Sequence, residues 1–194
     1  MPIKELIAAT NNAHKLEEIK AILEPHGIKV YSLKEKNIHI EVEEIGSTYL
    51  ENALLKANAI KPLSDLAIIS DDSGIEIEAM DNMPGIHSAR YADSLGGYYE
   101  AFQIIQAKCR EKNNYRATFY CTIVLLNYEN EPVVFKGIVP GRISDQIIGR
   151  NGFGFDPLFI ADETGVTNAS LSKEEKNLHS ARSKALFQLI DYVK

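Results

Sequence analysis

Two adjacent carboxylates stand directly after an apolar run in the segment SDDSG, residues 70–74. Both can leave water only if a cation or dense hydrogen bonding compensates their charge. Magnesium suits this position, because it commonly takes one or two protein carboxylates and completes its shell with waters and substrate phosphates. The alternative is a local turn in which Asp72 and Ser73 bond the nearby backbone before Gly74. We favour a metal-binding or catalytic role for the aspartates over that turn.

A second polar segment, ATNNAHK at residues 9–15, follows an apolar stretch and precedes a helical pattern. A turn between a strand and a helix presents backbone N–H groups and the positive end of the helix dipole, which together bind anions. Thr10 and Asn12 add side-chain donors, and Lys15 adds a cation one turn further along. A simple capped helix with a solvated lysine explains the same residues, because the segment lacks the glycines of a Walker loop.

A third acidic segment, EVEE at residues 41–44, precedes Gly46 in a region without clear periodicity. On its own such a segment is typical of a solvated run of charge. It gains a function only if the fold brings it close to Asp72.

The segment GFGFDPLF, residues 152–159, interleaves glycines with Phe153 and Phe155 and places Asp156 before a proline. Such a rigid backbone presents an aromatic ring for stacking on a base, together with a carboxylate or backbone group that reads the base edge. The same residues describe a glycine-rich turn that plugs its aromatic rings into the core. The sequence leaves both interpretations open.

A basic cluster is expected near the C-terminus. On a single helix Lys176, His179 and Arg182 fall at positions i, i+3 and i+6 and lie beside an apolar stripe. This pattern is typical of a solvated basic face. The histidines of the chain show no metal-ligand spacing, so zinc chemistry has little support.

The remaining pattern predicts a mixed α/β fold. The predicted strands cover residues 3–9, 28–32, 66–70, 74–80, 117–126 and 132–139, the last two as an antiparallel hairpin. An asparagine cap at residues 11–12 begins the first helix, with the acidic pair at residues 17–18 in its first turn. Thr48 begins the second helix with a capping-box pattern. Further helices are expected over residues 98–108 and, as one amphipathic helix, over residues 178–193.

Composition sets limits on the function. The 194-residue chain is 45% hydrophobic and 25% charged, which suits one large domain or two closely packed lobes. Its net charge of -6 gives no basic field for duplex nucleic acid, so a phosphate-bearing partner is expected to be a small molecule. No run of about 18 apolar residues predicts a membrane span. Cys109 and Cys121 form no C-x-x-C pair, which predicts reduced thiols and a cytoplasmic location.

Six segments stand in the order ATNNAHKLEEI, STYLENALLKA, SDDSG, PGIHSARYA, GFGFDPLF and KEEKNLHSAR. In these segments nearly the whole chain resembles the inosine/xanthosine triphosphate pyrophosphatase family, in its bacterial branch. The resemblance implies one two-lobed α/β domain spanning residues 1–194 around an elongated central sheet, with the nucleotide in the cleft between the lobes. It also implies magnesium-dependent hydrolysis of ITP, dITP and XTP to the nucleoside monophosphate and pyrophosphate, usually by a homodimer.

The resemblance assigns phosphate binding to residues of the first third of the chain. The family's phosphate-binding turn corresponds to Thr10, Asn12 and Lys15, and Asn11 stands where glycine is commoner. Asparagine tolerates a left-handed conformation better than most residues, so the turn is expected to form. The family's phosphate-holding helix lysine corresponds to Lys56.

The resemblance also assigns roles to the carboxylates. The catalytic, metal-associated aspartate corresponds to Asp72, which would ligate magnesium or orient and deprotonate the attacking water. The neighbouring substrate contact corresponds to Ser73. A metal-binding glutamate corresponds to Glu43 or Glu44, and we favour Glu43. Asp71 is then expected to support Asp72 or to bind a second metal ion.

Base recognition is the third implied role. The segment concerned consists of Phe153, Gly154, Phe155 and Asp156. Lys176 and Arg182 correspond to basic residues of the family, whereas the usual Ser-His-Arg triplet has Ala181 at its centre. The purine-contacting histidine is therefore missing, which leaves Arg182 as the expected purine contact of that triplet.

Two other functions remain open at this point. A septum-inhibitor-type nucleotide pyrophosphatase would prefer modified pyrimidine triphosphates, although the GFGFDP segment and the basic C-terminal residues argue against it. A non-catalytic nucleotide sensor would bind ITP without releasing pyrophosphate, and Ala181 is the residue that favours it.

Overall fold

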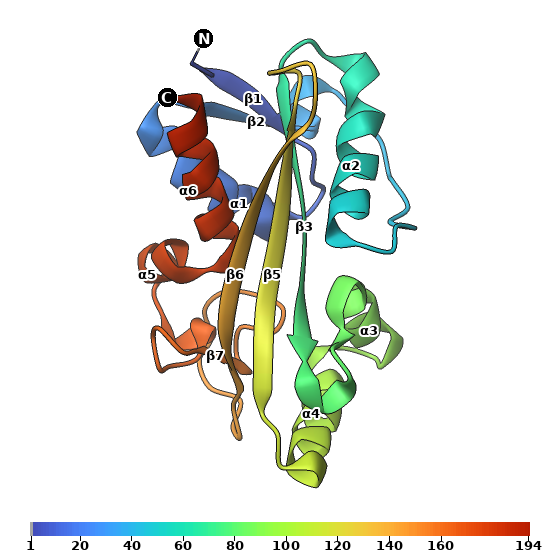
Figure 1. The fold of residues 1–194 in the computed structure, drawn as a ribbon, viewed down its shortest axis with the longest axis vertical. Coiled ribbons are helices and arrows are strands. Elements are labelled where there is room, and N and C mark those ends of the chain that lie inside the picture. The colour runs from blue at the N-terminus through green and yellow to red at the C-terminus, as the bar shows by residue number, and fades with distance from the viewer. Residues whose placement is uncertain (1) are drawn as a thin grey trace. The chain divides into compact units, whose positions relative to one another are not determined.

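The computed structural model describes residues 2–194, which form one mixed β-sheet and α-helices (Figure 1). The strands are β1 (Glu5–Ala8), β2 (Lys29–Ser32), β3 (Ala67–Ile77), β4 (Met83–Pro84), β5 (Arg116–Leu126), β6 (Val133–Ile143) and β7 (Phe159–Ala161). The α-helices are α1 (Ala13–Leu23), α2 (Tyr49–Ile60), α3 (Ser88–Ser94), α4 (Tyr98–Lys112), α5 (Lys173–His179) and α6 (Ala181–Val193). Within residues 2–194, every helix is too short or too polar to cross a membrane. The predicted mixed α/β class is confirmed.

The seven-stranded sheet has the order β2-β1-β3-β5-β6-β7, and β4 pairs with β3 beside this path. β1 pairs in parallel with both β2 and β3, so that Leu6 lies opposite Val30 on one side and Ala67 on the other. β6 and β7 are antiparallel. β5 and β6 follow one another in the chain and are neighbours in the sheet, as the predicted hairpin requires. The parallel pairing of β1 with β3 brings the turn that follows β1 beside the middle of β3.

The chain divides into two compact units. Unit 1 contains the residues up to Asp72, together with Cys121–Gly137 and Arg182–Lys194, and unit 2 contains Ser73–Tyr120 and Ile138–Ala181. β3, β5 and β6 each contribute residues to both units. These units correspond to the two lobes expected from the sequence. The single domain and the nucleotide cleft between its lobes stay predictions.

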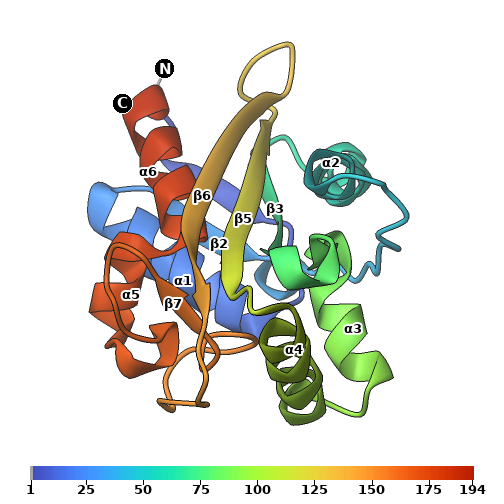
Figure 2. The same cartoon turned by 60° about the horizontal axis from the view of Figure 1, so that its bottom comes forward.

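In unit 1 the strands carry α2 on one face and both α1 and α6 on the other, as two views agree (Figures 1 and 2). The core on the α2 face includes Ile7, Leu33, Ile38, Ala53, Ala57, Ile60, Ile68 and Val124. The buried apolar residues of α1 and α6 include Ile19, Ile22, Leu23, Leu186 and Leu189. Strands covered on both faces have little contact with water, so a charged side chain among them needs a specific partner.

Unit 2 has an aromatic core. α4 contributes Phe102 and Ile105, and Phe155 and Phe159 complete the core from the loop before β7 and from β7 itself. The ring of Phe119 on β5 meets the ring of Phe159 edge to face, with 4.8 Å between centroids. Packing in this core fixes the position of the segment around Phe155.

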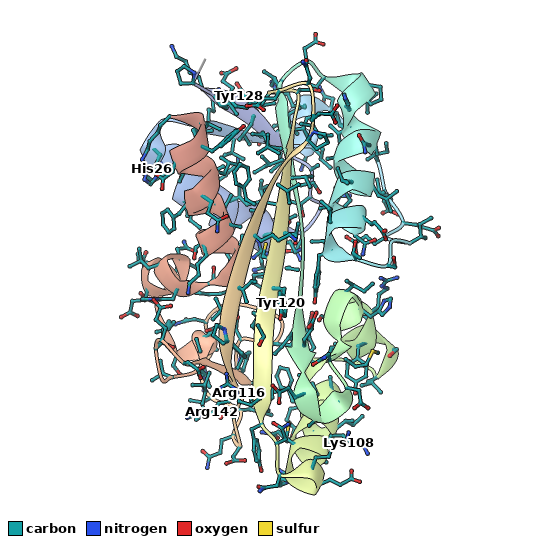
Figure 3. All side chains as sticks on the ribbon, viewed as in Figure 1. His26, Lys108, Arg116, Tyr120, Tyr128 and Arg142 are labelled. Atoms are coloured by element: carbon teal, nitrogen blue, oxygen red, sulfur yellow. The ribbon has the colours of Figure 1, made fainter. Side chains whose placement is uncertain are left out.

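The surface of unit 2 carries an ordinary ion pair. Arg116, at the beginning of β5 (Figure 3), donates its two terminal nitrogens to the two carboxylate oxygens of Asp162, at 3.1 Å each. Both side chains are about half exposed, at 48% and 47%. This pair is much more exposed than the ion pair between Asp71 and Arg182.

The structure corrects the predicted strand–turn–strand at residues 66–80. β3 is continuous and runs through both aspartates, and all its residues are buried or half-buried. Gly74 is not a turn residue: a Cβ atom on it would lie 2.0 Å from the carbonyl oxygen of Gly85. The glycine is needed because another segment of backbone approaches it closely.

The structure also divides the predicted C-terminal helix. α5 ends at His179, Ser180 is extended with φ -70 and ψ 158, and α6 begins at Ala181. The predicted single helical face bearing Lys176 and Arg182 is therefore wrong, because they lie on different helices and in different units.

The first helix is correctly predicted, but its first turn is not acidic. Because α1 begins at Ala13, residues 17–18 lie beyond the first turn. This places Glu18 on a helix interior position, where it finds a buried partner.

Candidate active site

The turn between β1 and α1 is held together by its own side chains. Asn12 Oδ1 accepts hydrogen bonds from the backbone N–H groups of His14 and Lys15, at 3.0 and 3.1 Å. Thr10 Oγ1 accepts one from the N–H of Asn12 at 3.1 Å. The predicted cap is confirmed, and the positive end of an 11-residue helix with a lysine beside it lies at this turn.

Asp71 points from β3 toward α1 and α6. Its Oδ2 accepts the ammonium of Lys15 at 3.1 Å and two nitrogens of Arg182, Nε at 3.3 Å and a terminal nitrogen at 3.0 Å. The other terminal nitrogen of Arg182 donates to Glu18 Oε2 at 2.5 Å. The side chains of Asp71 and Arg182 are only 2% and 7% exposed. Two acids and two bases thus form a charge-balanced buried network.

The network fixes the charge states of its members. Burial acts to raise the pKa of Asp71, but the nearby cations, Lys15 first, hold that pKa well below its usual range. Burial likewise disfavours the charge of Arg182, yet Asp71 holds the pKa of the guanidinium above its ordinary value. Cys121 Sγ lies 3.9 Å from Asp71 Oδ2, and burial together with that charge raises the pKa of the thiol to about 12. The thiol therefore stays protonated and unreactive.

Asp72 points to the opposite face of the strand, toward α2, because successive strand residues alternate. Its Oδ2 accepts a hydrogen bond from Asn52 Nδ2 at 3.1 Å, and Asn52 Oδ1 accepts one from the N–H of Gly46 at 2.8 Å. Asn11 Nδ2 in the first turn donates to the carbonyl of Ile40 at 3.0 Å. These amides connect the loop before α2 to both Asp72 and the turn between β1 and α1.

The same loop brings Glu44 to a lysine of α2. Lys56 Nζ lies 2.5 Å from Glu44 Oε1 and donates to the backbone carbonyl of Asp71 at 2.6 Å. Burial acts to lower the pKa of Lys56, but the charges of Asp71 and Glu44 raise it above its ordinary value. Glu43 is exposed, whereas Glu44 acts electrostatically on Asp72. The geometry favours Glu44 over the predicted Glu43.

Asp72 is short of compensating charge. Burial raises the pKa of this carboxyl to about 6, and the negative charge of Glu44 adds to the rise. The ammonium of Lys56 and the hydrogen bond from Asn52 act in the other direction without cancelling it. Asp72 is 3% exposed. A carboxylate whose pKa lies this close to neutral pH can accept a proton from an activated water.

Magnesium fits this part of unit 1 if waters and substrate phosphates complete its ligand shell. Among residues 2–194, no three His, Cys, Asp or Glu side chains gather in a group that could hold a metal ion by themselves. Asp72 and Glu44 offer two oxygen donors, which matches magnesium bound to one or two carboxylates, waters and substrate phosphates. Asp71 points to the other face of β3, where its Oδ2 pairs with Lys15 and Arg182. Its role as a supporting residue or second metal ligand stays a prediction.

In unit 2, Asp156 holds the shape of the 152–156 turn. Its Oδ2 accepts the N–H of Phe153 at 2.8 Å and the ammonium of Lys176 at 2.6 Å, and its Oδ1 accepts Asn168 Nδ2 at 3.2 Å. A Cβ atom on Gly152, where φ is 73°, would lie 2.1 Å from Asp156 Oδ2. The carboxylate predicted to read a base edge is therefore engaged within the protein, and only glycine fits beside it.

The two phenylalanines of this turn have different environments. Phe155 is 4% exposed and belongs to the core of unit 2, so the core interpretation is correct for it. Phe153 is half-buried, and the ammonium of Lys176 lies 4.6 Å from the centre of its ring, a cation–π contact. Gly154 between them has a φ of 63°. Of the predicted base-binding residues, Phe153 is the aromatic one with exposed surface.

Ser73 is the last of the predicted site residues, and Ala181 and His179 belong to the segment in which the family's purine-contacting histidine is missing. Ser73 follows Asp72 in β3 and belongs to unit 2. Ala181 is 7% exposed at the beginning of α6 and supplies no side-chain donor. His179 Nδ1 lies 2.9 Å from Glu163 Oε1, a partly exposed contact within unit 2.

Sequence reasoning missed Asn52 and Glu18. Asn52 stands beside Ala53 on the buried face of α2 with no exposed surface, so an amide on an apolar helix face was the available signal. Glu18 lies three residues after Lys15 on α1, a spacing that puts both on one side of a helix. Neither signal identifies its partner, because Asp72 and Arg182 are distant in sequence.

Comparison with known proteins gives consistent relatives over the whole chain. Residues 6–192 match the model of the Ham1 family. A dITP/XTP pyrophosphatase of Clostridium perfringens is 38% identical, with 99% of this chain and 98% of the relative aligned. A dITP/XTP pyrophosphatase of Bacillus subtilis is also 38% identical, with 96% of each chain aligned.

Solved structures of similar proteins share the fold. A HAM1 protein from Coxiella burnetii matches with a TM-score of 0.84 at 33% identity, covering 98% of each chain. The Ham1 protein of Staphylococcus aureus matches with a TM-score of 0.79 at 38% identity, again over 98% of each chain. The similarity extends over the residues of both units.

Proposed function

The chain belongs to the Ham1 family, and on this premise we propose that it hydrolyses dITP, ITP and XTP in a magnesium-dependent reaction. Water adds to the α-phosphorus, the bond from that phosphorus to the bridging oxygen breaks, and pyrophosphate leaves. The other product is the nucleoside monophosphate. The reaction would remove these purine nucleotides from the triphosphate pool.

The environment of Asp72 is the observation that carries the proposal. Burial raises the pKa of this carboxyl to about 6, so it is ionised at neutral pH and still basic enough to take a proton. We assign it the proton of the attacking water. Asn52 holds its Oδ2 at 3.1 Å and so fixes its orientation.

The cations of unit 1 suit the triphosphate. Lys56 on α2 and Lys15 at the positive end of α1 both act electrostatically on Asp72, and Lys15 also pairs with Asp71 Oδ2 at 3.1 Å. We assign them the charge that builds on the leaving pyrophosphate, since positioning and electrostatics dominate phosphoryl chemistry. Magnesium bound at Asp72 and Glu44 with the phosphates would neutralise phosphate charge and lower the pKa of a bound water.

We propose Phe153 as the stacking surface for the purine, because it is the aromatic of its turn with exposed surface. Selectivity would come from donors to the purine O6 and from leaving the adenine amino group unpaired, which a polar site punishes strongly. Arg182 is held by Asp71 and Glu18, so we do not assign it the purine contact that the sequence suggests.

Pyrophosphate release across a panel of nucleoside triphosphates, with and without magnesium, tests the proposal. We expect turnover of ITP, dITP and XTP well above that of ATP and GTP, and none after chelation. Equal activity on ATP and GTP would contradict it. Preference for modified pyrimidine triphosphates would indicate the septum-inhibitor type, and ITP binding without pyrophosphate release would indicate a sensor.

We also propose a homodimer working in the cytoplasm. The dimer rests on the family resemblance, and light scattering during size-exclusion chromatography tests it. The location rests on the two cysteines, Cys109 and Cys121, which are free and buried, as a reducing compartment allows. Localisation of a tagged chain in intact cells tests that assignment.

A further inference from the structure

The ammonium group of Lys56 lies beside Glu44 and acts electrostatically on Asp72, the two carboxylates that we propose as metal ligands. It lies 2.5 Å from Glu44 Oε1 and 2.6 Å from the backbone carbonyl oxygen of Asp71. The lysine side chain is 14% exposed and that of Glu44 31%, so the pair is shielded from water on the lysine side. The charges of Lys56 and Glu44 both act on Asp72. The ammonium group of Lys56 therefore stabilises the negative charge of both Glu44 and Asp72.

The surroundings keep the two carboxylates close without help from the lysine. The amide of Asn52 bridges Asp72 Oδ2 at 3.1 Å and the N–H of Gly46 at 2.8 Å, and it thereby anchors the loop that carries Glu44. A Cβ atom on Gly46 would lie 2.7 Å from Asn52 Oδ1, so this approach is tight. If the ammonium left, two like charges would face each other, which is unfavourable until another cation arrives.

From this arrangement we propose that Lys56 is an internal counter-ion that competes with the divalent metal for Glu44, so that metal enters together with the triphosphate. The inference rests on the proposed function, because the triphosphate supplies the anion toward which the lysine moves. Before substrate binds, Lys56 holds Glu44 and weakens the affinity for free metal. In the presence of a metal–nucleotide complex the ammonium of Lys56 would bind a phosphate oxygen, and Glu44 and Asp72 would together hold the metal.

The chemistry of lysine suits this exchange. An ammonium on a flexible four-carbon stem can change partners without moving the helix that carries it, and its charge is compact. In this exchange Glu44 would remain beside a cation, and the ammonium of Lys56 would lie beside the phosphates. Lys56 is thus a positioning residue for Glu44 as well as a phosphate ligand.

The test measures binding of free Mn²⁺, as a paramagnetic substitute for Mg²⁺, in the absence of nucleotide. Electron paramagnetic resonance reports the free ion for the wild type and for Lys56→Met. Because the variant removes the ammonium that is paired with Glu44, we expect its dissociation constant for Mn²⁺ to fall by about tenfold. Lys56→Arg keeps the charge and is expected to retain the weak binding of the wild type.

Lys20→Met is the matched control. It removes another lysine of unit 1 that is paired with a glutamate, Lys20 Nζ to Glu35 Oε2 at 3.0 Å, at a place without the candidate metal ligands. We expect it to leave Mn²⁺ affinity unchanged. Equal Mn²⁺ affinity of the wild type and Lys56→Met would overturn the inference.

If Lys56→Met does not fold, the wild type alone decides the question. Lysine ammonium groups labelled with ¹⁵N are followed by NMR while Mg²⁺ is added, first alone and then with an α,β-methylene analogue of ITP. We expect the Lys56 signal to move only in the presence of the analogue. Movement with Mg²⁺ alone would contradict ordered entry of the metal.

The two proposals can fail separately. Turnover of ITP by the wild type, combined with unchanged Mn²⁺ affinity in Lys56→Met, would overturn the role of Lys56 and leave the proposed function standing. Tighter Mn²⁺ binding by Lys56→Met, in a protein whose wild type releases no pyrophosphate, would overturn the function and support the competition for metal.

Discussion

Asp71 and Asp72 are neighbours on β3, yet the two faces of that strand give them opposite electrostatic environments. On the face covered by α1 and α6, Asp71 meets Lys15 and Arg182, and its pKa is held well below the usual range. On the face covered by α2, Asp72 accepts a hydrogen bond from a neutral amide, and burial raises its pKa to about 6. Both are almost completely buried.

The difference shows that burial of an acid does not by itself mark it as functional. An acid whose charge is balanced by cations of the protein serves the fold, because removing either partner leaves an uncompensated buried charge. An acid whose burial is not offset by nearby cations is stabilised when it binds a metal ion or a proton. Such perturbed groups concentrate at functional sites. We therefore propose that Asp71 stabilises the fold and that Asp72 takes part in the reaction.

The largest expected effect that separates them is on turnover. Asp72→Asn keeps the shape and the acceptor for Asn52 but removes the charge and the base. We expect pyrophosphate release from ITP to fall by about a thousandfold, the scale of general-base and charge-stabilisation losses. Initial rates at saturating ITP and magnesium measure it. Turnover close to that of the wild type, in a folded variant, would break the comparison.

The second effect is on stability, and it falls on the other face. Asp71→Asn removes the carboxylate that Lys15 and Arg182 share in this buried network, so we expect a loss of about 3–5 kcal/mol in the free energy of unfolding. Urea denaturation followed by circular dichroism measures this loss.

Asp162→Asn is the matched control for that measurement. It also removes an aspartate from an arginine pair, but Arg116 and Asp162 are about half exposed, so the expected loss is at most about 1 kcal/mol. Equal losses for the buried and the exposed aspartate would show that the network of Asp71 is not structurally special.

The third effect has the opposite sign. The pKa of Asp72 is raised from its ordinary value of 3.8 to about 6, so its ionisation opposes folding at neutral pH. This destabilisation is absent below the unfolded pKa, grows as pH rises toward 6, and is complete above the folded pKa. Asp72→Asn is thus expected to gain about 1–3 kcal/mol at neutral pH in metal-free buffer.

The pH dependence of that gain is its own control. Unfolding measured from neutral pH down to about pH 3 should show the gain of Asp72→Asn disappear as the wild-type carboxyl becomes protonated in both states. A variant that is less stable than the wild type at neutral pH would contradict the electrostatic assignment.

The smallest effect concerns the thiols. Burial raises the pKa of Cys121 to about 12, with Asp71 adding to the rise, and raises that of Cys109 to about 11. Neither thiol of the native wild type is expected to react with a disulfide reagent at neutral pH. Asp71→Asn should make Cys121 react first, through local opening, whereas Asp72→Asn should leave both protected. Equal labelling of the two variants would contradict this.

Local interactions account for what the sequence predicted correctly. The cap of α1 depends on Asn12 and the two amides that follow it within three residues, and the cap of α2 depends on Thr48 in the same way. The turn between β1 and α1 could therefore be predicted, and its role in phosphate binding stays a prediction. In α2 only half of the capping box forms, because the carboxylate of Glu51 turns back to the N–H of Ser47 instead of Thr48.

Contacts between distant residues account for what the sequence could not give. A strand through two aspartates is unfavourable until Asp71 meets Arg182, 111 residues later in the chain, so a turn was predicted there. The separation of the two carboxylates onto opposite faces follows from that continuous strand. The break at Ser180 was hidden because the apolar pattern of α6 extends to Leu178, which is 61% exposed.

The assignment of individual side chains depended on such contacts as well. Glu43 and Glu44 are indistinguishable in sequence, and the lysine of α2 selects Glu44. The sequence predicted that Asp156 contacts the purine base. In the structure its carboxylate pairs with the ammonium of Lys176, 20 residues later in the chain. The order of the motifs predicted the family, whereas the environment of each carboxylate could be described only once its partners were known.

A carboxyl ¹³C NMR titration of the wild type, with aspartate side chains labelled and metal excluded, tests the separation of Asp71 from Asp72 most directly. The account predicts that Asp72 titrates with a midpoint of about 6, while Asp71 stays ionised down to the pH at which the protein unfolds. Midpoints near the ordinary value for both aspartates, or the reverse order, would contradict it.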